Sequence, residues 1–235
     1  MSTPSTEIIK NKAKVHTVYK RADGKRVPSA TTILGVINKR GLVHAAWELG
    51  VQGIDHEAYW SELAEIGTLT HAMIYAHIKG NKPEDIMAEH SPSIQDKAQN
   101  CFISYLEWER GHKIEPILME TPLVSEDFSF GGTPDFFGYI DGALTLMDFK
   151  TGKGVWPEHF YQLAAYRQLL EENGYLFGEN DTGILRLNLN RFLILNVQRS
   201  ESEAYYEKLK TDVSACWMVF LDALNLYKDM QKAEK

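Results

Sequence analysis

Residues 134–152 read PDFFGYIDGALTLMDFKTG, and the pairing of this stretch fixes the fold that we expect. Asp141-Gly142 is a typical two-residue hairpin turn, with aromatic and β-branched residues on both sides. Pairing outward from that turn places Asp135 opposite Asp148. Opposed Cβ atoms on one sheet face lie about 4.5–5.5 Å apart, and like charges at this separation repel. The sequence therefore predicts a divalent cation between the two carboxylates.

The residues after Asp148 complete this pattern. Lys150 lies two positions further on, so strand alternation puts its ammonium on the same face, where it can orient or activate a water beside the metal. Phe149 points its side chain into the core and leaves its backbone carbonyl as a further oxygen ligand. Asp-x-Lys alone is more often a surface ion pair on a hairpin, but the facing Pro134-Asp135 favours the metal site.

The remaining chain predicts an α/β fold with a mixed central sheet covered by helices. An N-terminal hairpin joins 15–19 to 26–28 through an Asp23-Gly24 turn. Ser61 and Ser93 are the expected N-caps of the third and fourth helices. The helices are expected at 29–37, 43–49, 61–78, 93–110, 157–172 and 201–232, and the strands at 114–124, 133–140, 144–149, 184–189 and 192–197.

Composition is typical of a globular protein. The chain has 235 residues, of which 44% are apolar, 11% aromatic and 24% charged. We expect a flexible basic tail at 1–13 and a single domain at 14–235, because no repeat or linker separates two units. Within the domain, 14–112 forms the N-terminal hairpin and helices, 113–200 the catalytic sheet and helix, and 201–235 the C-terminal helix. No apolar stretch approaches the roughly 20 residues of a membrane span and no signal peptide is evident, so a cytoplasmic protein is expected.

Motif content excludes several cofactors. Two cysteines cannot supply the four thiolates of an iron–sulfur cluster or of an all-cysteine zinc site. The chain has no Gly-x4-Gly-Lys-Ser/Thr motif, so no nucleotide cofactor is expected. Any metal must therefore be held mainly by oxygen and imidazole.

Positive charge is concentrated at the N-terminus. Nine Lys or Arg residues against two acids give residues 1–40 a charge of +7, and because the whole chain carries −7, the rest carries −14. An acidic body needs a local cationic path to hold a polyanion such as DNA. We therefore expect phosphate contacts from the hairpin and the turn after it, with a solvated tail as the alternative for Lys10, Lys12 and Lys14. The expected DNA-binding residues are Lys20, Arg21, Lys25, Arg26, Ser29 and Thr31.

Three further motifs accompany the metal-site stretch. Gln162 and Tyr166 are spaced i, i+4 on one helical face, His71 ends the segment GTLTH at 67–71, and residues 28–34 read PSATTIL. Together these features resemble the PD-(D/E)xK nuclease superfamily in its RecB-like branch, which includes phage exonucleases and the mitochondrial genome maintenance exonuclease. The chain departs from that pattern at Tyr75, where relatives often have an acid, and it lacks the cluster-binding cysteines of some members.

The resemblance implies a restriction-endonuclease-like core and a metal-dependent DNA exonuclease that acts at DNA ends in phage or bacterial recombination, replication or repair. The implied setting is the bacterial or phage-infected cytoplasm, and the implied partners are DNA and an annealing protein or helicase. Glu120, which ends the preceding strand, is a weaker candidate for a metal ligand or water-orienting residue. The implied roles are Mg2+ or Mn2+ binding by His71, Asp135, Asp148 and the Phe149 carbonyl, water positioning by Lys150, and binding of the scissile strand by Gln162 and Tyr166.

Several alternatives stay open at this point. His71 and the pair Gln162 and Tyr166 also fit ordinary packing of amphipathic helices. A non-cleaving DNA-end-binding subunit of a recombination complex and an endonuclease of the same superfamily are the alternative functions. The first is disfavoured, because repelling carboxylates have no reason to persist without a metal. The sequence does not give strand polarity, strandedness or oligomeric state.

Overall fold

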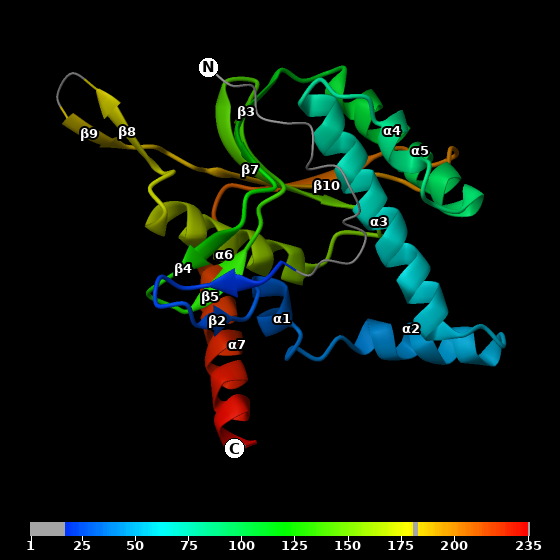
Figure 1. The fold of residues 1–235 in the computed structure, drawn as a ribbon, viewed down its shortest axis with the longest axis horizontal. Coiled ribbons are helices and arrows are strands. Elements are labelled where there is room, and N and C mark those ends of the chain that lie inside the picture. Colours follow the sequence, from blue (N-terminus) through cyan, green and yellow to red (C-terminus); the bar gives the residue numbers. More distant parts are fainter. Residues whose placement is uncertain (1–16, 181–182, 235) are drawn as a thin grey trace.

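The chain folds around one mixed five-stranded sheet (Figure 1). The computed structural model describes residues 17–180 and 183–234. Strands β7 and β10 are parallel, and the crossover connection that parallel strands need contains helix α6 (Pro157–Glu172). The other neighbouring strands of the sheet are antiparallel. The expected α/β fold with a mixed, helix-covered sheet is confirmed. The strand order is β11 (Tyr206–Lys210), β10 (Arg191–Asn196), β7 (Ala143–Lys150), β6 (Phe136–Ile140) and β3 (Ile114–Met119).

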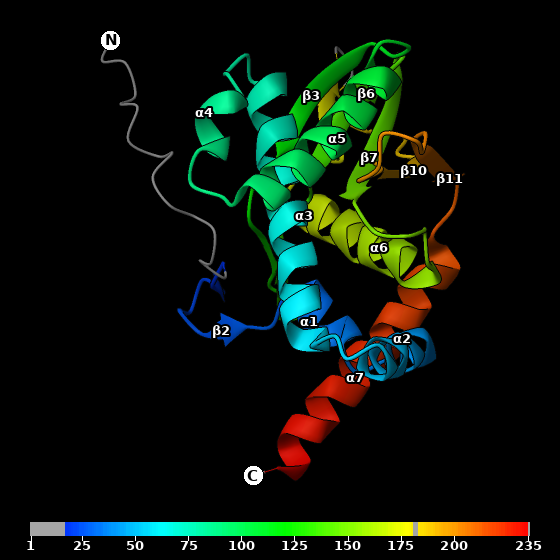
Figure 2. The same ribbon diagram turned by 90° about the vertical axis from the view of Figure 1, so that its right-hand side faces the viewer.

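Helices cover both faces of the sheet (Figures 1 and 2). Leu144 and Leu146 of β7 belong to the buried cluster shared with α1 (Ala30–Leu34), α6 and α7 (Ser214–Ala233). Met147 and Phe149 belong to the cluster on the opposite face, shared with α3 (His56–Ile78) and α5 (Pro92–Glu109). Helices α2 (Arg40–Val51) and α4 (Glu84–Met87) adjoin α3. The end of β7 therefore lies between two helical layers.

The hairpin of β6 and β7 has the predicted turn and register. The ladder runs from Ile140 opposite Ala143 to Phe136 opposite Met147. Asp141 and Gly142 have φ angles of 52° and 76°, the left-handed conformation that an Asp-Gly turn of this kind requires. Both predictions are confirmed.

Both predicted N-caps, Ser61 and Ser93, are wrong. Helix α3 begins at His56, because Asp55 accepts from the N–H groups of Glu57 and Ala58 at 2.9 and 3.3 Å; Ser61 lies inside the helix. Helix α5 begins at Pro92 with Ser91 as its N-cap, so Ser93 is also not a cap. The short helix α4 was not predicted.

One predicted strand is divided in two, and another is shorter than predicted. The predicted strand 114–124 breaks at Glu120, whose φ of 45° is incompatible with an extended strand, into β3 and β4 (Leu123–Ser125). The predicted strand 133–140 begins only at Phe136, as β6, and β5 (Phe130–Gly132) before it was not predicted. Strands β4 and β5 pair with each other in a separate two-stranded sheet.

The C-terminal region contains one wrong prediction. Residues 206–210 form β11 on the open edge of β10, where a helix over 201–232 was expected, and α7 begins only at Ser214. Pairing at a sheet edge satisfies backbone groups of β10 that a helix would leave without partners. Strand β8 (Phe177–Asn180) was also not predicted, and it pairs with β9 (Gly183–Arg186) in a separate hairpin.

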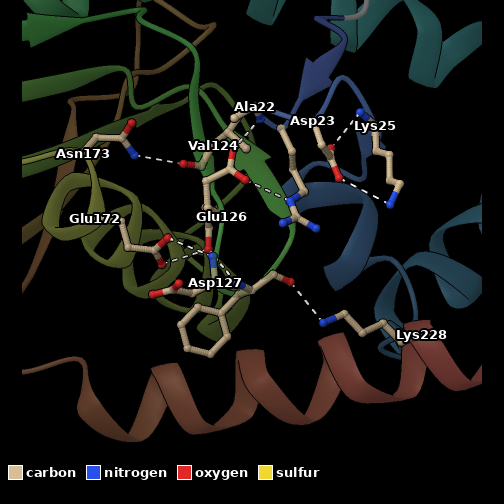
Figure 3. Close-up of polar contacts among 12 residues, drawn as sticks. Ala22, Asp23, Lys25, Val124, Glu126, Asp127, Glu172, Asn173 and Lys228 are labelled. Atoms are coloured by element: carbon tan, nitrogen blue, oxygen red, sulfur yellow. Dashed lines mark hydrogen bonds and ion pairs between the residues drawn. The ribbon is translucent and has the colours of Figure 1, made fainter.

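The N-terminal hairpin is present but shorter than expected. It pairs β1 (Tyr19–Lys20) with β2 (Arg26–Val27), and Gly24 has the left-handed φ of 81° expected in its turn. Figure 3 shows how Glu126, in the turn between β4 and β5, holds it: Glu126 accepts from Arg21 Nε at 3.0 Å and from the N–H of Ala22 at 2.7 Å. The expected tail at 1–13 and the first two residues of the expected hairpin lie outside the described residues.

Candidate metal centre and active site

The predicted site residues converge at the end of β7. Asp148 and Lys150 lie on β7 itself, while Asp135 lies one residue before β6 and Glu120 one residue after β3. His71 comes from α3 in one helical layer, and Gln162 and Tyr166 come from α6 in the other. Residues separated by up to 95 positions in the sequence therefore meet at one end of the sheet.

His71, Glu120 and Asp135 form a candidate metal centre. Each offers one ligand atom, and these atoms lie within 4.8 Å of one another. His71 Nδ1 lies 3.5 Å from Asp135 Oδ1 and 3.7 Å from Glu120 Oε1. Asp135 is buried, His71 is half-buried and Glu120 is exposed. One imidazole and two carboxylates match the ligand chemistry of Mn2+ and related divalent cations.

The other side of the His71 ring is fixed. Its Nε2 lies 3.1 Å from the carbonyl oxygen of Phe149. An Nε2–H that donates to this carbonyl leaves Nδ1 directed at the carboxylates, which is how outer-shell partners orient a ligating histidine. The Phe149 carbonyl, predicted as a metal ligand, is therefore engaged by His71, while its side chain is buried in the core as predicted.

Charge strongly affects the protonation of His71. Burial disfavours the imidazolium, but the carboxylates of Asp135 and Glu120 outweigh burial and raise the pKa of His71 well above its ordinary value. At neutral pH the imidazolium thus supplies the positive charge that the two carboxylates need. A metal ion that binds through Nδ1 must displace that proton.

Asp148 belongs to a second, buried polar network. Its Oδ2 lies 2.5 Å from Nζ of Lys150, and its Oδ1 accepts from Nε2 of Gln162 at 2.9 Å. Gln162 also accepts from Lys150 Nζ at 3.2 Å and donates to the Tyr166 hydroxyl at 2.8 Å. Lys150 thus lies on the same face as Asp148, as strand alternation predicts.

The pKa values of Asp148, Lys150 and Tyr166 in this network are all raised. Burial, with the nearby charge of Asp135, raises the pKa of Asp148 although Lys150 opposes this. Burial favours the neutral amine of Lys150, but Asp148 and Asp135 outweigh it and raise the pKa of Lys150. Burial and the same two carboxylates raise the pKa of Tyr166 well above its usual value. Lys150 therefore acts as a cation and hydrogen-bond donor at neutral pH, and Tyr166 remains a neutral hydroxyl.

Asp135 and Asp148 lie close together, but Asp135 belongs to the candidate metal centre and Asp148 to the polar network with Lys150. The ladder ends at Phe136 and Met147, and Asp135 Oδ2 accepts from the N–H of Phe149 at 2.8 Å. Asp135 is thereby turned toward His71, whereas Asp148 is turned toward Lys150. The predicted repulsion is still present, because the charge of Asp135 raises the pKa of Asp148.

Glu120 has more structural support than its place in the sequence suggested. Its φ of 45° is unusual for a residue with a side chain, and such strained positions cluster at functional sites. Its N–H donates to the carbonyl of Pro134 at 3.0 Å, which holds the strained residue beside Asp135.

A groove of about 530 Å³ connects the N-terminal hairpin to this centre. Glu120 and Thr133 lie on its wall, with Arg26, Ser29 and Thr31 from the hairpin and the turn after it. Lys20, Arg21 and Lys25 belong to the same hairpin but do not line this groove. Of the predicted DNA-binding residues, Arg26, Ser29 and Thr31 thus line a groove together with Glu120 of the metal centre.

Local contacts occupy several of these side chains. Arg21 pairs with Glu126 and Lys25 Nζ lies 3.4 Å from Asp23, as Figure 3 shows. Ser29 Oγ accepts from the N–H of Thr32 at 3.0 Å and so caps α1. Ser29 therefore has a structural role in addition to any contact with a ligand.

Three residues near the site are not among the predicted catalytic, metal-binding or DNA-binding residues. The Tyr19 hydroxyl lies 2.8 Å from Thr133 Oγ1, and burial with the charge of Glu120 raises the pKa of Tyr19. The pKa of His159 falls to about 4, because burial and the charge of Lys150 disfavour its imidazolium. The sequence signal for His159 is its position one turn before Gln162 on α6. Gly67 leaves room for the residue that follows β7, because a Cβ at position 67 would lie only 3.3 Å from Thr151 Oγ1.

Comparisons with known proteins add no family assignment. No protein-family model matches the chain, and the comparison with curated proteins finds no match. Among the described residues, no helix combines the length and apolar character needed to cross a membrane.

Proposed function

We propose that the chain is a metal-dependent DNA nuclease, most simply an exonuclease that hydrolyses phosphodiester bonds at DNA ends. The observation that carries this proposal is the convergence of two groups at the end of β7. One is the His71, Glu120 and Asp135 cluster, and the other is the Asp148 and Lys150 ion pair. A group of carboxylates, an imidazole and a lysine at one strand end fits phosphoryl transfer to water.

The donor set fits Mg2+ or Mn2+ held by His71, Glu120 and Asp135, with the Asp148 and Lys150 ion pair beside it. Such an ion, when bound, polarises a phosphoryl oxygen as a Lewis acid and lowers the pKa of a coordinated water. Lys150 stays protonated beside Asp148, so it contributes a positive charge and hydrogen bonds at the scissile phosphate rather than accepting a proton. Gln162 positions this pair from α6.

The groove supports DNA as the substrate. It leads from the basic hairpin to Glu120 and has hydroxyl groups and Arg26 on its wall, which are groups that contact phosphates. The rest of the chain is acidic, so this path is where a polyanion meets least repulsion.

The finer fold assignment is part of the same proposal. The order β3, β6, β7, crossover helix α6 and parallel β10 supports a restriction-endonuclease-like core of the RecB-like PD-(D/E)xK type. This assignment rests on the motifs at Pro134-Asp135 and 148–150 together with that topology.

The test uses linear end-labelled DNA and closed circular DNA of the same sequence, with Mg2+, with Mn2+ and with EDTA. We expect metal-dependent loss of label from the linear DNA while the circle stays intact. Nicking of the circle identifies an endonuclease instead, and DNA binding without cleavage in either metal identifies a non-cleaving subunit.

Two variants assign the reaction to this site. Asp135→Asn removes one carboxylate charge from the candidate centre and should abolish cleavage. Glu65→Gln is the matched control, because Glu65 lies on the same helix as His71 but pairs with His90 at 2.8 Å. Cleavage by Asp135→Asn at the wild-type rate would overturn the site assignment.

A further inference from the structure

Trp156 is a large exposed aromatic residue immediately before α6. It is 56% exposed and follows Lys150 by six positions. The loop between them is tied to the end of β10. Asn196 Nδ2 donates to the carbonyl of Gly152 at 3.0 Å, and the N–H of Val197 donates to the carbonyl of Lys150 at 2.8 Å. Trp156 therefore occupies a defined place beside the candidate active site.

Trp156 also continues a stripe of site residues along α6. Trp156, His159, Gln162 and Tyr166 are spaced by three, three and four positions, so they share one side of the helix. Gln162 and Tyr166 belong to the network around Asp148. The stripe thus leads outward from the candidate active site to the exposed indole.

His159 fixes the backbone of Trp156. Its Nδ1 accepts from the N–H of Trp156 at 3.3 Å, which requires an unprotonated Nδ1. The pKa of His159 is lowered to about 4, so the imidazole is neutral at neutral pH and can accept this hydrogen bond. The indole lies along its own loop, since a Cβ at Gly154 would be 3.8 Å from its Cζ2.

Two lysines lie near this loop. Lys153 is exposed on the same loop, and Lys39 lies 3.9 Å from Glu158 in the first turn of α6. Proteins that hold single-stranded nucleic acid combine cations that follow the phosphates with aromatic side chains on which bases stack. Trp156 and its lysines have this chemistry, and they lie next to the proposed cleavage site.

We infer that Trp156 stacks on a base of the DNA strand just outside the candidate active site, so that the site takes an unpaired strand. This inference rests on the proposed function and adds to it the class of substrate. A base inside a duplex has both faces covered by its neighbours, so a strand that runs past Trp156 into the active site can stack on the indole there only where it is unpaired.

The test measures binding of a 12-nucleotide oligo(dT) and of an abasic oligomer of equal length, with Ca2+ in place of the catalytic metal. Stacking on one aromatic side chain contributes about 5- to 150-fold in affinity. Trp156→Ala should therefore weaken oligo(dT) binding by a factor in that range. Wild type should bind the abasic oligomer about as weakly as Trp156→Ala binds oligo(dT). Trp156→Ala should bind the two oligomers with nearly equal affinity.

Two further variants separate stacking from other effects. Trp156→Phe should keep most of the affinity but lose the quenching of tryptophan fluorescence that oligo(dT) causes in wild type. Phe177→Ala is the control, because Phe177 is also an exposed aromatic, 45% exposed, but lies beyond the opposite end of α6. This control should bind oligo(dT) like wild type.

The outcomes distinguish this inference from the proposed function. If wild type cleaves DNA and Trp156→Ala binds oligo(dT) as tightly as wild type, the inference is overturned and the nuclease proposal stands. Equal loss of affinity for oligo(dT) and the abasic oligomer in Trp156→Ala also overturns it, because the indole would then act without a base. A wild type that neither binds nor cleaves any DNA overturns both.

Discussion

The side-chain amide of Gln162 donates to Oδ1 of Asp148 over 2.9 Å, from α6 to the adjacent end of β7. Its oxygen accepts from Lys150, and its second hydrogen is donated to the Tyr166 hydroxyl. Both donor hydrogens of the amide are therefore used inside the protein. Gln162 is in this way placed to position the ion pair, although the sequence alone suggested that it binds the scissile strand.

Gln162→Ala should lower the cleavage rate at saturating DNA by about 10- to 100-fold, the usual cost of removing an outer-shell partner. DNA affinity in Ca2+ should change little, because the amide is buried and engaged. Single-turnover cleavage and equilibrium binding measure the two quantities separately. Weaker DNA binding with an unchanged rate at saturation would instead support the strand-binding role.

Asp148→Ala should destabilise the protein in EDTA by about 3–5 kcal/mol, because it leaves the half-buried ammonium of Lys150 without its fully buried partner. The double variant Asp148→Ala with Lys150→Ala should lose less than the sum of the two single variants. Urea unfolding of all four proteins gives the coupling free energy. Additive losses would show that the ion pair does not form.

Metal binding should release about one proton near pH 7. The raised pKa of His71 means that the metal-free site holds a proton there, and this proton competes with the metal. Metal affinity should therefore increase with pH until the pKa of His71 is passed. Calorimetric titration with Mn2+ in two buffers of different ionisation enthalpy counts the protons.

The same proton determines how His71 affects folding. A histidine whose pKa is raised in the folded state stabilises that state at low pH, and this contribution is lost as pH rises through the folded pKa. His71→Ala should abolish proton release and flatten this part of the stability profile, whereas Glu65→Gln should leave both unchanged. Proton release that persists in His71→Ala would assign the proton to another group.

Lys20 and Arg26 should account for more of the salt dependence of DNA binding than Arg21 and Lys25, which already pair with Glu126 and Asp23. Replacing Lys20 and Arg26 by Gln should reduce the slope of log K against log salt by about 1.4–1.8 in magnitude.

The single variant Lys25→Gln is the control for this experiment, and it should reduce the slope by less than the value for one phosphate. Binding constants across a salt series in Ca2+ provide the measurement. A reduction of about 0.7–0.9, the value for one whole phosphate, would show that the ion pair of Lys25 with Asp23 yields to DNA. That result would agree with the DNA-binding role expected for Lys25 from the sequence alone.

Sequence alone predicts the features that depend on neighbouring residues. The Asp-Gly turn at 141–142 requires left-handed backbone at two successive positions, and that requirement fixed the register of β6 against β7. Strand alternation then placed Lys150 on the face of Asp148 and Phe149 in the core. Both results follow from backbone geometry over fewer than about twenty residues.

Tertiary structure decided how the site divides and what completes it. Asp135 turned toward His71 and Asp148 toward Gln162, because the two helical layers offer different partners on opposite sides of β7. Residues 206–210 became a strand because β10 had an open edge, which no local pattern reveals. Such contacts join residues far apart in the sequence, so their energy depends on which surfaces the fold brings together rather than on local preference.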